Sequence, residues 1–108
     1  MEKITFKSGA TRSKISPVRY DLITPIGLRR LAETYAEGAA IHGDRNWENG
    51  LPMDDCLNRA VRHIYSYFEG DTSEDHLGHA AWNILAAMHF EEKNQKKEDK
   101  WNLGKKAE

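Results

Sequence analysis

Two ladders of polar side chains have the residue types and the spacing of a divalent-cation site. Glu33 and Glu37 are four residues apart, and Asp75, His79 and Asn83 repeat the same step further along the chain. On helices, each set would lie along one face. Mg²⁺ binds carboxylate oxygens, and Mn²⁺ also accepts imidazole nitrogen. The candidate metal ligands and catalytic residues are therefore Glu33, Glu37, Asp75 and His79.

Structural roles account for the same ladders. Glu33 and Glu37 could form a solvated helix face, with Arg30 pairing to Glu33, and Asp75 could serve in a helix capping box. His76, His79 and Asn83 could be buried polar side chains with hydrogen-bond partners inside the protein. Spacing alone leaves both interpretations open.

The segment before the second predicted helix carries side chains suited to a nucleobase. Residues 42–52 place Arg45, Asn46 and Trp47 between two glycines. An indole can stack on a base, while a guanidinium and an amide can hydrogen-bond to its edges. These three residues are candidate base contacts, although a structural turn in which Trp47 closes one end of the bundle fits equally well.

Further polar side chains are candidate contacts to the substrate. Arg62 and His63 lie together on the second predicted helix, and Lys14 lies in a basic N-terminal arm. Arginine binds phosphate through a bidentate fork. The Asn83 amide, on the second ladder, is also a candidate substrate contact. Surface charge or salt bridges would explain the basic residues almost as well.

Three helices must position these side chains. They are predicted at about 24–43, 52–69 and 72–93. Thr24 is a suitable N-cap followed by proline, and Gly43 is a suitable C-cap. Thr72 is predicted as the N-cap of the third helix, with Asp75 completing a capping box.

The pattern predicts an all-α fold. It consists of an extended N-terminal arm at 1–23 with a short strand near 4–6, a bundle of three main helices at 24–93, and a charged tail at 94–108 predicted to be disordered. Between residues 80 and 90 only Asn83 and His89 interrupt the apolar residues, so the third helix should be central. Three helices of this length cannot cover it, so we expect a homo-oligomer, a dimer or tetramer.

Composition excludes several classes of protein. The 108 residues have a net charge of −1, which argues against a dedicated nucleic-acid binder, and their longest apolar run, 84–88, is too short for a membrane span. The single cysteine, Cys56, excludes an internal disulfide and a multi-cysteine zinc site. We therefore expect a cytoplasmic protein. Without a nucleophile motif, any hydrolysis would use a metal-activated water.

Several of these segments resemble one phage family. They are RYDLI at 19–23, Pro25, LAETYAEGA at 31–39, GDRNWE at 43–48, RH at 62–63 and HLGHAAWN at 76–83. Together they are similar to the dATP/dGTP diphosphohydrolase N-terminal family, also called MazZ-like, over about residues 6–92. That family is related to the all-α MazG-like nucleotide pyrophosphohydrolases.

The resemblance implies an activity and a cofactor. A purine deoxynucleoside triphosphate would be cleaved between its α and β phosphates, giving the monophosphate and pyrophosphate, with Mg²⁺ or Mn²⁺ as cofactor. In phages that use 2,6-diaminopurine, such an enzyme supplies dGMP for modified-base synthesis. A phage-encoded enzyme of this kind would act in the host cytoplasm. MazG-like enzymes hold metal with Glu-x-x-Glu and Glu-x-x-Asp ladders. Here the first pair is spaced by four, and Asp75, His76 and His79 stand where the second pair is expected.

Two other classes of function fit the sequence. One is a catalytically silent nucleotide-binding module in which the substituted second ladder no longer activates water. The other is a helical interaction protein whose helices only mediate oligomerisation.

Overall fold

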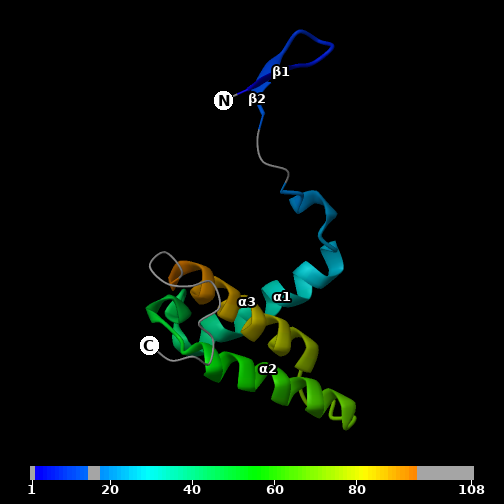
Figure 1. Ribbon diagram of the computed structural model, residues 1–108. Coiled ribbons are helices and arrows are strands. Elements are labelled where there is room, and N and C mark those ends of the chain that lie inside the picture. Colours follow the sequence, from blue (N-terminus) through cyan, green and yellow to red (C-terminus); the bar gives the residue numbers. More distant parts are fainter. Residues whose placement is uncertain (1, 15–17, 95–108) are drawn as a thin grey trace.

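The computed structural model describes residues 2–14 and 18–94, which are mostly helical (Figure 1). The elements in chain order are β1 (Lys3–Thr5), β2 (Thr11–Ser13), the short 3-10 helix η1 (Tyr20–Leu22), α1 (Pro25–His42), the 3-10 helix η2 (Asn46–Asn49), α2 (Met53–Phe68) and α3 (His76–Asn94). The three predicted helices are confirmed. The predicted disordered tail lies outside the described residues, apart from its first position.

Both ends of α1 are set by the predicted capping residues. The Thr24 hydroxyl accepts a hydrogen bond from the Gly27 N–H at 3.2 Å, and Pro25 follows in the first turn. At the other end the Gly43 N–H donates to the Ala39 carbonyl at 2.8 Å. Gly43 has a φ of 98°, which glycine adopts without a steric penalty. Local chemistry is therefore sufficient to define this helix.

The start of α3 differs from the prediction. Thr72 is not its N-cap, because the helix begins at His76 and Asp75 takes the capping position: its Oδ1 accepts from the Gly78 N–H at 3.0 Å. The preceding residues form a turn in which Asp71 Oδ1 accepts from the Ser73 N–H at 3.1 Å. Asp71 and Asp75 thus each accept one backbone N–H in this region, where Thr72 was expected to act.

Residues 3–13 of the N-terminal arm form a β-hairpin: the predicted strand near 4–6 is present as β1, and a second strand, β2, was not predicted. β1 and β2 pair antiparallel, with Ile4 opposite Arg12. In the turn, the Phe6 N–H donates to the Ala10 carbonyl at 2.8 Å, and Gly9 has a φ of 93°. The second strand was missed because its three residues, all polar, lack the alternation of apolar side chains that marks a strand.

The core lies where α2 and α1 pack against α3, which confirms the predicted central position of the third helix (Figure 1). The buried apolar side chains are Cys56 and Ala60 of α2 and Ala80, Ala86, Ala87 and Phe90 of α3. Most are small, so the helices approach closely and the core is thin. Among the described residues, none of the helices has both the length and the apolar character needed to cross a bilayer.

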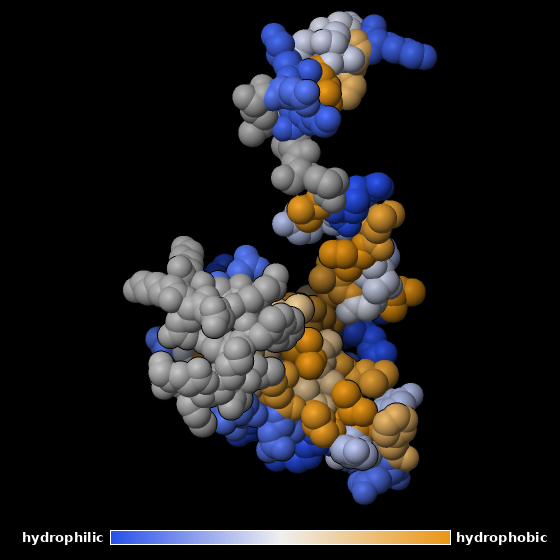
Figure 2. Space-filling view, viewed as in Figure 1, coloured by the Kyte–Doolittle hydropathy of each residue, from blue (hydrophilic) through white to orange (hydrophobic). Residues whose placement is uncertain are grey.

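Large apolar side chains stay exposed on all three helices (Figure 2). Ile41 of α1 is 74% exposed, Phe68 of α2 is 75% exposed and Met88 of α3 is 50% exposed. Isolated exposed apolar side chains are normal, but a small domain with this many on every helix leaves much of its apolar surface in water. The expectation that a second copy covers this surface stays a prediction.

Asp75 joins α1 to the start of α3. Besides capping α3, its carboxylate pairs with the Arg30 guanidinium, whose Nε lies 3.3 Å from Oδ2. Arg30 is the main reason why the pKa of Asp75 lies below its usual range. A carboxylate with a lowered folded-state pKa stabilises the fold above its unfolded pKa of about 3.9, and this stabilisation is lost as the pH falls through the folded-state pKa.

Replacing Asp75 by alanine should lower the free energy of unfolding by about 1 kcal/mol at neutral pH, the usual cost of losing an N-cap. Asp75→Asn is the matched control, because its amide oxygen still caps the helix but carries no charge for Arg30. Urea unfolding of the three proteins at pH 7 and at pH 2–4 measures both effects. The difference between wild type and Asp75→Asn should shrink at acidic pH; a constant difference would contradict the role of the charge.

Candidate active site

A cavity of about 950 Å³ lies between α1, the η2 loop and the facing sides of α2 and α3. Clefts of about 300–1,000 Å³ are typical of small-molecule sites. The polar and aromatic side chains that line the cavity include Tyr35 and Glu37 of α1, Arg45, Asn46 and Trp47 of the loop, Arg59 and His63 of α2, and His79, Trp82 and Asn83 of α3. One part of the wall is therefore acidic and imidazole-rich, and another is aromatic.

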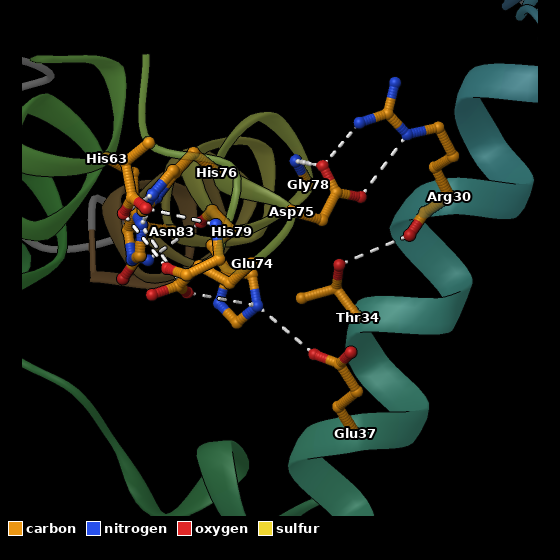
Figure 3. Close-up of polar contacts among 12 residues, drawn as sticks. Arg30, Thr34, Glu37, His63, Glu74, Asp75, His76, Gly78, His79 and Asn83 are labelled. Atoms are coloured by element: carbon orange, nitrogen blue, oxygen red, sulfur yellow. Dashed lines mark hydrogen bonds and ion pairs between the residues drawn. The ribbon is translucent and has the colours of Figure 1, made fainter. Parts of the chain in front are cut away.

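The acidic part of the wall brings two helices together around one imidazole (Figure 3). Oε1 of Glu37, on α1, lies 3.2 Å from Nε2 of His79, on α3. Oε1 of Glu74, in the loop before α3, lies 3.6 Å from the same nitrogen. The Glu37 side chain is 61% exposed and that of His79 is 29% exposed, so both remain open to a ligand. Two carboxylates thus flank one partly exposed imidazole.

Two further imidazoles lie next to this group. Nδ1 of His63, on α2, is 2.9 Å from Nδ1 of His76, and the His63 ring centre is 5.1 Å from that of His79. The Nε2–H of His76 donates to Asp71 Oδ2 at 2.7 Å, which lowers the pKa of Asp71. Burial lowers the pKa of His63, against the opposing effect of the nearby Glu74 carboxylate. His63 is therefore neutral at physiological pH.

The aromatic part of the wall is built around Trp47. Its indole contacts the rings of His89 and Phe90 edge to face, with ring centres 4.9 Å and 6.2 Å away. Tyr35 lies between Trp47 and Trp82, at 6.4 Å and 5.7 Å, and its burial raises the pKa of its phenol. Trp47 thus contacts rings of both α1 and α3 and also lines the cavity, so a structural role and a base contact are compatible for this residue.

A family model described as dATP/dGTP diphosphohydrolase, N-terminal, matches residues 7–100, a range that includes all three helices and the whole lining of the cavity. The chain belongs to this family. The resemblance seen in the sequence is thereby confirmed. Comparison with curated proteins and with solved structures gave no match.

Within this member of the diphosphohydrolase family, two of the four candidate metal ligands meet and two lie apart. Glu37 and His79 face each other across the cavity wall. Glu33 instead pairs with Arg29 at 3.1 Å, and Asp75 pairs with Arg30, and neither lines the cavity. The alternative pairing of Arg30 with Glu33 is wrong, because Arg30 reaches across to α3.

Most of the candidate substrate contacts line the same cavity as Glu37. They are Arg45, Asn46, Trp47, His63 and Asn83. Asn83 is buried and its amide donates to the His79 carbonyl at 2.9 Å, so it also ties one turn of α3 to the next. Lys14 pairs with Glu2 in the hairpin at 3.3 Å, and Arg62 is exposed; neither lines the cavity.

Sequence reasoning missed Glu74 and Asp71 as parts of the polar cluster. The predicted capping box placed Glu74 inside the third helix and assigned the chemical role to the neighbouring Asp75. The Asp71–Ser73 turn delays the helix, and the resulting loop directs Glu74 toward His79. Arg59 also lines the cavity, and it pairs with Asp55 at 2.8 Å. A tight Asp-x-Ser turn was the signal that could have revealed the loop.

Proposed function

We propose that this chain hydrolyses dATP, dGTP or both to the monophosphate and pyrophosphate, with Mg²⁺ or Mn²⁺ as cofactor. Membership of the diphosphohydrolase family supports the class of substrate. The observation that carries the proposal is the approach of Glu37 to His79 at the wall of a cavity large enough for a nucleotide. In a phage that uses diaminopurine, the dGMP product would feed modified-base synthesis.

The side chains around His79 fit a divalent cation. Glu37 and Glu74 present carboxylate oxygens to the same imidazole at 3.2 Å and 3.6 Å, and carboxylates are the ligands that Mg²⁺ and Mn²⁺ prefer. These two residues would hold the cation. When bound, it would offset negative charge on the phosphate oxygens and acidify a coordinated water.

His79 is placed to handle the water. Its imidazole projects from α3 between the two carboxylates and remains partly exposed to the cavity. There it would orient the water that attacks phosphorus and take up its proton as the phosphorus–oxygen bond to pyrophosphate breaks. The adjacent Glu37 carboxylate would stabilise the protonated imidazole. Asn83, bound to the His79 carbonyl, would hold this turn of α3 in place.

The aromatic part of the wall would receive the purine. Trp47 and Tyr35 offer ring surfaces, and Arg45 and Asn46 offer donors and acceptors at the edge of the same cavity. The base would then lie near η2 with its triphosphate directed toward His79. The exposed apolar surface of the three helices supports assembly into a homo-oligomer, which would also enclose more of the bound nucleotide.

A panel of deoxynucleoside triphosphates tests the proposal. Purified full-length protein is mixed with each one, with Mg²⁺, with Mn²⁺ or with a chelator, and the products are separated by chromatography. We expect dGMP or dAMP with equimolar pyrophosphate, only when metal is present, and little product from pyrimidines. A nucleotide-dependent rise in melting temperature without turnover would favour the silent binding module, and no effect of any nucleotide would favour the interaction protein.

A further inference from the structure

His63 and His76 are in direct contact through their imidazole rings. Their Nδ1 atoms face each other at 2.9 Å, and the two side chains are only 13% and 4% exposed. Two nitrogens that share one metal ion at ~2.1 Å stand roughly 3.0–3.4 Å apart for bond angles between 90° and tetrahedral. The observed separation is therefore close to that of a pair of ligands to one ion.

A third donor is directed at the same space. Oε1 of Glu74 lies 3.9 Å from His63 Nδ1, and the ligand atoms of His63, Glu74 and His76 all lie within 4.8 Å of one another (Figure 3). A single hydrogen bond between the imidazoles would account for the first contact. It would not account for the Glu74 carboxylate, whose Oε1 approaches His63 as well as His79.

Asp71 fixes the ring of His76 in the orientation that a ligand needs. Because Asp71 Oδ2 accepts the Nε2–H at 2.7 Å, the tautomer of His76 that has its proton on Nε2 has a free lone pair on Nδ1, and this nitrogen faces His63. A carboxylate that binds the far nitrogen of a ligating histidine is a regular feature of metal sites, where it sets the tautomer and raises the basicity of the ligand.

We infer that His63, Glu74 and His76 form a binding site for a divalent transition-metal ion of the Zn²⁺ type, with Asp71 as the orienting residue. Two imidazoles and one carboxylate select such an ion over Mg²⁺, which prefers oxygen ligands. The site shares Glu74 with the cation site proposed at Glu37 and His79, but metal binding by it does not depend on the proposed hydrolysis. Glu74 lies between the two, because its Oε1 is 3.9 Å from His63 Nδ1 and 3.6 Å from His79 Nε2.

Metal titration of the protein alone tests this site. Tag-free full-length protein is stripped with a chelator and titrated, without nucleotide, with Zn²⁺ by calorimetry and with Co²⁺ by visible absorption. We expect one equivalent of each to bind, with Mg²⁺ at least 100-fold weaker. Glu74→Gln and His63→Gln should each weaken Zn²⁺ binding at least tenfold, and Asp71→Asn should weaken it about 10- to 100-fold.

His89→Gln is the matched control, because it removes an imidazole outside the cluster, and its Zn²⁺ affinity should equal that of the wild type. The Glu74 side chain is 44% exposed, so its variant should fold normally even if the variants of the buried histidines do not; circular dichroism checks each one. Absence of Zn²⁺ binding, or equal affinity in wild type and Glu74→Gln, would overturn the inference. Because no nucleotide is present, failure here leaves the proposed hydrolysis standing, and the reverse also holds.

Discussion

Replacing Glu37 by glutamine is expected to lower kcat for purine deoxynucleoside triphosphate hydrolysis by about 10²- to 10³-fold, the range seen when one group that stabilises charge in a transition state is lost. Glu37 is the carboxylate of α1 that lies 3.2 Å from His79 at the cavity wall. Glutamine keeps the shape of the side chain but removes the negative charge that would bind the cation and stabilise the imidazolium. Steady-state kinetics with saturating metal measures the change.

Glu33→Gln and Glu69→Gln provide the comparison. Glu33 lies on the same helix one turn earlier but pairs with Arg29 and does not line the cavity, so its loss should be less than tenfold. Glu69, exposed at the end of α2, should leave the rate unchanged. Equal losses in Glu33→Gln and Glu37→Gln would contradict a site built on Glu37 and His79 and would favour the ladder predicted from spacing alone.

The largest expected effect on stability is that of Gly78→Ala. A methyl group at Gly78 would lie 2.6 Å from Asp75 Oδ2 and 2.7 Å from Thr34 Oγ1. Neither atom can move freely, since the Asp75 carboxylate pairs with Arg30 and the buried Thr34 hydroxyl donates to the Arg30 carbonyl at 3.2 Å. We expect a loss of about 1–3 kcal/mol in the free energy of unfolding, the usual cost of overpacking, because α1 must move away from α3.

Gly38→Ala is the control for the same substitution. Gly38 also lies in a helix, but a methyl group there would meet no atom within 4 Å. Alanine should therefore stabilise α1 by about 0.5–1 kcal/mol through its higher helix propensity. Urea unfolding gives both values. Changes of the same sign in the two variants would show that packing between α1 and α3 does not depend on Gly78.

The sequence by itself determined the helices wherever neighbouring residues decide the outcome. Thr24 and Gly43 cap α1 through bonds within one turn, and the apolar run of α3 made this helix central in any packing. Such interactions are local or depend on composition, so they can be identified without knowing the partners. The family could be recognised for the same reason, because its motifs are short and contiguous.

Only the tertiary structure decided which acids belong to the site. Successive residues of a helix are about 100° apart, so Glu33 and Glu37 differ in direction by only about 40°, and their spacing could not show which one faces α3. The orientation of α1 about its own axis decides which of the two glutamates faces α3. The ion pair between Arg30 of α1 and Asp75, distant in sequence, helps to fix this orientation.

The same reason explains the cluster around His63 and His76. Its members come from α2, from the loop after it and from the first turn of α3, and they meet only because the Asp71 turn delays the start of α3. Side chains brought together by a loop conformation and by helix packing share no spacing along the chain. The cluster could therefore be identified from the tertiary structure but not from the sequence.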